Sequence, residues 1–159
     1  MRFWFDTEFI EDGKTIELLS IGIVAEDGRE YYAEPEEAVR YFSRADPWVQ
    51  DNVLVHLTGD RKPRAQIAAE IVEFCGARPE FWAYYADYDW VALCQLHGRM
   101  IDLPKGWPMF CRDVKQFCVD LGNPDLPKQT STEHHALADA RWTRDAHAFL
   151  KALSQEETK

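Results

Sequence analysis

The stretch FWFDTEFI, residues 3–10, decides the fold and sets two carboxylates into it. In an extended strand, residues two apart point to the same face, so Asp6 and Glu8 face one way. Apolar side chains occupy both faces of the same stretch: Phe3, Trp4, Phe5, Phe9 and Ile10. A strand that is apolar on both faces is normally covered on both faces. We therefore predict a buried strand that carries two acids.

Two carboxylates at such a position need compensation, because like charges cost heavily away from water unless they are paired or metal-bound. Surface ion pairing is the alternative, but it fits poorly beside four aromatic side chains. Since all the ligands would be oxygens, Asp6 and Glu8 favour magnesium or manganese over zinc.

Two later stretches carry further candidates for the same site. WAYYADYDWVAL, residues 82–93, offers Asp87 and Asp89 just before a helical pattern. EHHALADAR, residues 133–141, offers His134, His135 and Asp139. Acids from separate elements, together with a histidine, are what a metal-dependent hydrolase needs.

The three motifs, in this order, resemble the DEDDh family of 3′–5′ exonucleases. The resemblance extends over residues 1 to about 150. The opening FDTEFIEDGKTIELLSIGIVAEDGREYYA, and the chain from residue 82 onward, are most similar to ribonuclease AS, the polyadenylate-specific branch found in mycobacteria. The segment from about residue 35 to 64 does not share this similarity.

The resemblance implies a two-metal site for Mg²⁺ or Mn²⁺. Asp6 would bridge both ions, Glu8 would hold the ion on the water side, and Asp89 and Asp139 would complete the ligand set. His134 would accept the proton of the attacking water. The same resemblance implies single-stranded RNA as substrate, degraded from its 3′ end to nucleoside 5′-monophosphates, an adenylate preference and a homodimer.

The third acid is Asp89 rather than Asp87 by the family pattern. That pattern places an aromatic residue directly before the acid and a leucine four residues after it, which Tyr88 and Leu93 satisfy. Asp87 follows an alanine and has Val91 at the corresponding distance. Asp87 is therefore expected to be a solvated turn residue or an outer contact.

The histidine presents a conflict between helix geometry and family spacing. His135 lies four residues before Asp139 and would share its helix face. The family spacing of five selects His134, which would stand roughly 140° away on a continuous helix. His134 can therefore reach the site only from the loop or first turn, and residues 130–132 offer polar candidates for the helix cap.

Substrate contacts are expected at four positions: Phe9, Ile10, Trp90 and Arg112. The first two follow the strand acids, where this family meets the terminal nucleotide, and an aromatic ring can stack on a base. Trp90 flanks the third acid, and Arg112 precedes a helix where a phosphate could bind. Packing in the core is the alternative for the apolar residues among them.

The composition fits one globular domain, residues 1–153, followed by a polar tail, 154–159. The chain is 46% hydrophobic, which excludes a disordered chain. No apolar run approaches the ~20 residues that cross a bilayer, so no membrane partner is expected. The N-terminus lacks a signal-peptide pattern, which indicates a cytoplasmic protein. The cysteines, which form no C-x2-C pair, are expected to be mainly buried free thiols: Cys75, Cys94, Cys111 and Cys118.

The net charge of −10 is unusual for a protein that binds a polyanion. Long-range attraction cannot be the main force, so divalent ions and a local track of basic side chains would have to replace it. The clustered basic residues could supply that track: Arg61, Lys62, Arg64, Lys105, Arg112, Lys115 and Lys128.

The order of elements indicates an α/β fold. Strands are expected at 2–10, 17–25, 29–33, 80–85 and 109–111, and helices at 36–43, 47–57, 64–75, from 90, 113–121 and 133–153. Early strands followed by alternating helices predict a mixed five-stranded sheet flanked by helices, in the ribonuclease H-like arrangement that the resemblance implies. The competing functions are an oligoribonuclease-like enzyme, a DNA-directed exonuclease and a catalytically silent nucleic-acid-binding module.

Overall fold

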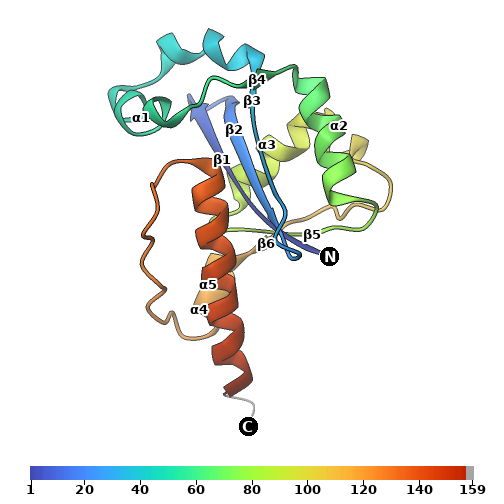
Figure 1. Ribbon diagram of the computed structural model, residues 1–159, viewed down its shortest axis with the longest axis vertical. Coiled ribbons are helices and arrows are strands. Elements are labelled where there is room, and N and C mark those ends of the chain that lie inside the picture. The colour runs from blue at the N-terminus through green and yellow to red at the C-terminus, as the bar shows by residue number, and fades with distance from the viewer. Residues whose placement is uncertain (157–159) are drawn as a thin grey trace.

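Four longer strands and two strands of two residues form one mixed sheet (Figure 1). The computed structural model describes residues 1–156. The order across the sheet is β4-β3-β2-β1-β5-β6. Strands β1–β3 are antiparallel neighbours, whereas the β1–β5, β5–β6 and β3–β4 pairs are parallel. The bounds are β1 Arg2–Glu11, β2 Ile16–Ala25, β3 Glu30–Pro35, β4 Arg61–Lys62, β5 Glu80–Ala83 and β6 Arg112–Asp113.

The α/β class and the mixed sheet are confirmed, but the expected count of five strands is wrong. The sixth strand, β4, pairs with the end of β3 and is too short to leave a pattern in the sequence. The strand expected at 109–111 lies instead at Arg112–Asp113, where it pairs with β5. Met109 and Phe110 are exposed, so their apolar character reflects a surface loop rather than a strand.

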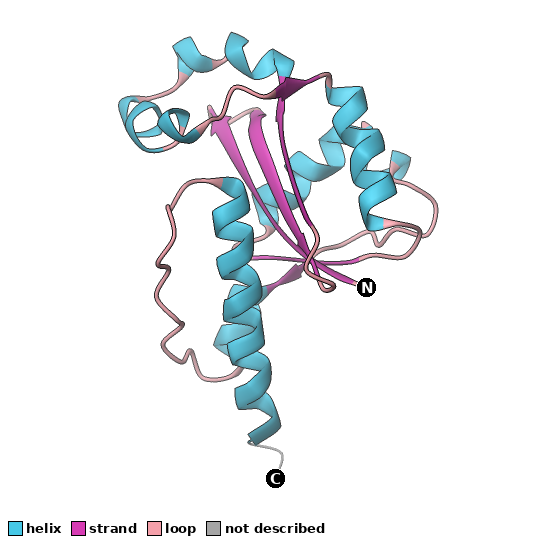
Figure 2. Cartoon of the chain, in the orientation of Figure 1, coloured by secondary structure: helices cyan, strands magenta, loops and turns pink. Residues whose placement is uncertain are grey.

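The helices cover both faces of this sheet (Figure 2). Their bounds are α1 Pro47–Asn52, α2 Arg64–Cys75, α3 Asp87–His97, α4 Val114–Asp120 and α5 Ala136–Glu156, with 3₁₀ turns at Glu36–Arg40, Phe42–Arg44, Leu54–His56 and Met100–Asp102. Helix α5 begins three residues later than expected and continues to Glu156, so half of the predicted polar tail is helical. The remaining tail residues, 157–159, lie outside the described part of the chain.

Strand β1 is covered on both faces, as its sequence predicts. Phe3 and Phe5 pack in one apolar cluster with Ile67 of α2 and Leu93 of α3. On the opposite face, the rings of Trp4 and the α5 residue His147 lie 5.6 Å apart between centroids. Alternate side chains of one strand therefore anchor two different helical layers. Within residues 1–156, no helix combines the length and the apolar character that a bilayer span requires.

The start of α5 rests directly on the sheet because residue 22 is a glycine. Gly22 pairs with Asp6 across the β1–β2 ladder. A Cβ atom at this position would overlap the backbone of Ala136 and Leu137. An isolated glycine inside a strand often marks such a close backbone approach. It brings the first turn of α5, with Asp139, beside the acids of β1.

Gly22→Ala is expected to destabilise the protein more than an ordinary glycine replacement, because α5 must move away from the sheet. The control is Gly13→Ala in the β1–β2 turn, where the backbone is left-handed but no atom lies near the added methyl group. That change should cost about 1–2 kcal/mol from backbone strain alone. Thermal or urea unfolding of both variants measures the difference. An equal or smaller loss for Gly22→Ala would contradict the close packing.

Candidate active site

Strand β1 presents Asp6 and Glu8 on the face covered by α5. The ladder with β2 is regular through Glu8 and Ser20, and then shifts register between Glu8 and Phe9. Such bulges bend a strand and re-aim the side chains beside them. Glu8 is buried and Asp6 is partly buried, so both carboxylates lie at the edge of the protein interior rather than on an open surface.

Helix α3 adds Asp89, which the structure ties to β1. Its Oδ1 accepts hydrogen bonds from the backbone N–H of Thr7 (2.8 Å) and from the Thr7 hydroxyl (2.6 Å). Thr7 stands between the two strand acids, so these bonds hold Asp89 next to them. Asp87 is exposed at the helix start and faces a different cavity, beside Arg112. Asp89, and not Asp87, is thus bonded to the strand of Asp6 and Glu8, and its place in the catalytic set stays a prediction.

The loop before α5 brings His134 to the same place. Its backbone adopts a left-handed conformation, with φ of 61°, which is uncommon for a residue with a side chain. Its N–H donates to Oδ2 of Asp139 at 2.9 Å. This is the approach from outside the helix that a five-residue spacing requires.

His135 has a structural position instead. Its ring stacks on Tyr32, with centroids 4.9 Å apart and planes 16° apart. Its Nδ1 accepts from the backbone N–H of Ala138, and its carbonyl accepts from that of Asp139. These contacts cap the first turn of α5 and hold the imidazole against Tyr32.

Glu8, His134 and Asp139 converge closely enough to share one ion. Each offers one ligand atom, and the three atoms lie within 4.8 Å of one another. Asp6 lines a cavity of about 200 Å³ together with His134 and Asp139. Asp6, His134 and Asp139 thus border one small cavity, Glu8 lies close to His134 and Asp139, and Asp89 is held beside the strand acids through Thr7.

Burial, together with repulsion between the carboxylates, disfavours the charged forms of these acids. Burial, followed by the charges of Asp89, Glu8 and Asp139, raises the pKa of Asp6 well above its ordinary value. Burial and the charges of Asp139 and Asp89 raise the pKa of Glu8 to about 8. For Asp89, burial raises the pKa to about 6 although the bonds from Thr7 oppose it. Burial likewise raises the pKa of Asp139.

The donor set fits a divalent cation. Within residues 1–156, no lysine or arginine forms an ion pair with Asp6, Glu8, Asp89 or Asp139. The surface ion pairing considered for the strand acids is therefore not what compensates them. Carboxylate oxygens with one neighbouring imidazole suit Mg²⁺ or Mn²⁺, and a bound cation would reverse the effect of like charges on each pKa.

The sequence pattern described as the 3′-5′ exoribonuclease Rv2179c-like domain matches residues 1–150. The chain belongs to this family. Membership in the Rv2179c-like family confirms the enzyme class expected from the three motifs, a 3′–5′ exoribonuclease.

Two curated relatives share this assignment. The 3′-5′ exoribonucleases Rv2179c and MT2234.1, from two strains of Mycobacterium tuberculosis, are each 46% identical over 149 residues, covering 89% of this chain and 88% of theirs. Among solved structures, exonuclease I superposes with a TM-score of 0.65 at 14% identity. The match covers 97% of this chain and 40% of that one, and it shows a shared fold.

The four expected substrate contacts occupy different surroundings. Phe9 lies beside the acids, with its ring edge-on to Tyr88 at 5.6 Å. Ile10 is buried in an apolar cluster under the 3₁₀ turns, and Trp90 packs against the main core. Arg112 lies on β6, where it pairs with a glutamate of β5 at 3.6 Å. Protein contacts account for the last three, and a substrate role for all four stays a prediction.

Two residues of this site were not anticipated from the sequence. Trp48 of α1 lies edge-on to the His134 ring, 4.8 Å away between centroids, and is 54% exposed. The segment of residues 35–64 therefore borders the site, and the match to the family over residues 1–150 includes it, contrary to the expectation that this segment lacks the similarity. Gln129 donates a short hydrogen bond from its side-chain amide to Oδ1 of Asp139. An exposed tryptophan in the polar run DPWVQD was a usable signal, whereas nothing in the sequence distinguishes Gln129.

The raised pKa values predict how stability without metal depends on pH. A carboxyl group with a raised pKa binds its proton more tightly in the folded chain, so its contribution falls as pH rises from its unfolded to its folded pKa. For Glu8 this window runs from about 4.5 to about 8. In EDTA, the melting temperature of Glu8→Gln should therefore exceed that of wild type, and the difference should grow as pH rises across this window. Each kcal/mol of stability lost by wild type corresponds to roughly 2–4 °C.

Thermal unfolding with and without Mg²⁺ measures this effect. The control is Glu36→Gln, at an exposed position remote from the acids. Mg²⁺ should stabilise wild type most near pH 8, and Glu8→Gln much less. If the difference in melting temperature between Glu8→Gln and wild type does not depend on pH, the pKa of Glu8 is not raised in the folded protein.

Proposed function

We propose that this chain hydrolyses single-stranded RNA from its 3′ end, releasing nucleoside 5′-monophosphates with the help of two Mg²⁺ or Mn²⁺ ions. The observation that carries the proposal is the convergence of four carboxylates that have no ion-pair partner in residues 1–156, beside a histidine held by the loop before α5. Membership in an exoribonuclease family supports the same reaction and polarity.

The acids have separate places in this proposal. Asp6, at the centre of the group, would contact both ions, while Glu8 would hold the one nearest the water. Asp89 and Asp139 would complete the set from α3 and α5. When bound, the ions would lower the pKa of the attacking water and stabilise charge on the leaving 3′ oxygen.

His134 is the side chain placed to take the proton of the water. It lies within 4.8 Å, between ligand atoms, of both Glu8 and Asp139. A neutral imidazole accepts a proton near neutral pH, and its loop position leaves it beside the cavity. The bond from its own N–H to Asp139 fixes the backbone from which the ring projects.

Aromatic side chains beside the acids support a single-stranded substrate. Phe9 and Tyr88 form one edge-to-face pair, and Trp48 lies edge-on to the His134 ring. Such rings can stack on unpaired bases, at ~1–3 kcal/mol per base. The proposed adenylate preference rests on the resemblance to ribonuclease AS, as does a homodimer.

Incubation with 3′-labelled oligomers tests the proposal. Wild type should shorten poly(A) and poly(U) with Mg²⁺, faster than poly(dA) of equal length, and should release 5′-monophosphates. EDTA should abolish the reaction. Asp89→Asn should lose most activity, whereas the matched Asp87→Asn should stay within a few-fold of wild type. Faster degradation of poly(dA) would assign the protein to DNA, and full activity in EDTA would refute the metal-dependent reaction.

Replacing the two histidines separates the general base from the helix cap. His134→Ala should lose ~10²–10⁴-fold in turnover while it still binds metal and RNA, because general-base assistance is typically of that size. His135→Ala should lower thermal stability, since it removes the Tyr32 stack and the cap, with a much smaller effect on turnover. Single-turnover rates and melting temperatures distinguish these outcomes. A larger rate loss in His135→Ala, with metal binding intact, would reverse the assignment.

A further inference from the structure

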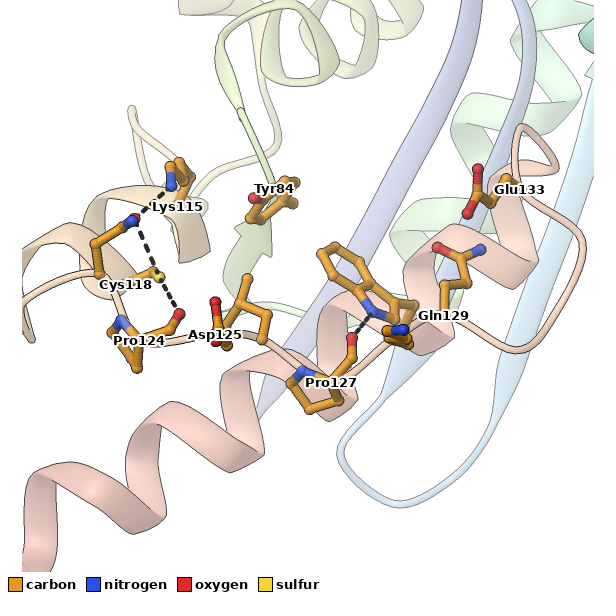
Figure 3. Close-up of a pocket in the computed structure, with 12 residues that line it drawn as sticks. Tyr84, Lys115, Cys118, Pro124, Asp125, Pro127, Gln129 and Glu133 are labelled. Carbon is orange, nitrogen blue, oxygen red and sulfur yellow. Dashed lines mark hydrogen bonds between the residues drawn. The ribbon is translucent and has the colours of Figure 1, made fainter.

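A second cavity adjoins the proposed catalytic centre. It encloses about 540 Å³ and shares four lining residues with the smaller cavity of Asp6 and His134: Tyr84, Gln129, Glu133 and Trp142. Figure 3 shows the lining residues extending from Glu133 and Gln129 to Lys115 at the far side. The two cavities therefore adjoin each other at these four side chains.

The wall of this cavity is held in place by side-chain hydrogen bonds. It is formed by the loop between α4 and α5, which has no regular secondary structure. The Trp142 indole N–H donates to the carbonyl of Pro127 at 2.8 Å, and Lys115 Nζ donates to Asn123 Oδ1 at 2.7 Å. At the other end, Gln129 is bound to Asp139. Long loops fixed in this manner are commonly binding elements.

Two lysines of this cavity have no acidic partner. Most of the other clustered basic side chains are paired with glutamates: Arg61, Lys62, Arg64 and Arg112. Within residues 1–156, neither Lys115 nor Lys128 forms an ion pair, and both line the cavity. In a chain of net charge −10, these two lysines, of which Lys115 also donates to Asn123, lie next to the proposed site of phosphodiester cleavage.

The remaining lining matches the rest of a nucleotide. Tyr84 and Leu126 offer apolar surface to a base or sugar. Asp125 and Glu133 can accept hydrogen bonds from ribose hydroxyls or base N–H groups. Two acids make this cavity a poor site for free phosphate. Cations and acids together suit a phosphate that is joined to its sugar and base.

We propose that this cavity holds the nucleotide on the 5′ side of the scissile bond, with Lys115 and Lys128 against the phosphate at its 5′ end. The inference rests on the proposed function and on the prediction from the resemblance that Phe9 and Ile10 meet the terminal nucleotide. The cavity of Lys115 and Lys128, which contains neither of these residues, is then available to the remaining strand. The cavity makes the enzyme sensitive to a phosphate that the reaction itself does not touch.

Dinucleotides with and without a 5′-phosphate test this directly, because only the former carries the phosphate that the lysines would bind. Wild type should show a kcat/KM about tenfold higher for the 5′-phosphorylated dinucleotide. Lys115→Gln combined with Lys128→Gln should lose this preference and retain the rate on the unphosphorylated dinucleotide. Lys14→Gln combined with Lys151→Gln, at exposed positions outside the cavity, should behave as wild type. A preference that survives in the Lys115/Lys128 variant, or that wild type lacks, would overturn the inference.

Binding measured without turnover separates this inference from the proposed function. In a His134→Ala background with Mg²⁺, the double change at Lys115 and Lys128 should weaken binding of a labelled octanucleotide. It should also reduce the slope of log affinity against log salt by about 0.7 per lost phosphate contact. If wild type cleaves no RNA, the proposed function fails, and this assay still decides the cavity: unchanged affinity and slope overturn it, and the stated losses support it. Lys115→Arg, which keeps the charge, should preserve both.

Discussion

Repulsion among four buried or partly buried carboxylates is the constraint on which the rest of this structure depends. Burial raises the pKa of each, neighbouring charges raise it further for Asp6, Glu8 and Asp89, and no lysine or arginine within residues 1–156 pairs with them. A fold does not retain such a group for its own stability, since replacing a strained acid should stabilise it. Divalent cations are the compensation that also performs chemistry, and at this site they would attract RNA to an otherwise acidic protein.

Close backbone packing and hydrogen bonds, rather than ion pairs, hold the four acids together in this fold. Gly22 removes the side chain that would keep α5 away from β1, so Asp139 can lie beside Asp6. Thr7 reaches the opposite layer and holds Asp89 with two hydrogen bonds. The two faces of β1 thus recruit acids from two helical layers. Phe3 and Phe5 anchor one layer, and Trp4 anchors the other.

Much of this could be predicted because it depends on local periodicity. Apolar side chains on both faces of β1 predicted its buried position in the sheet. The conflict between helix geometry and family spacing required His134 to lie outside the helix. The structure places it there, with φ of 61°. The two-residue strands could not be predicted, because pairing over two residues depends on tertiary contact alone. Trp48 reaches the site from a distant segment, and Gln129 lies in the loop before α5, where no pattern in the sequence relates it to Asp139.

Diffraction from crystals soaked in Mn²⁺ tests the central claim most directly, because anomalous scattering locates the ions independently of any assay. We predict two peaks about 3.5–4 Å apart, one on each side of Asp6 and within ligand distance of Glu8, Asp89 and Asp139. Both peaks should weaken in Asp6→Asn crystals. Crystals that bind no Mn²⁺ among these carboxylates at millimolar concentration, or that bind it only elsewhere, would contradict the account.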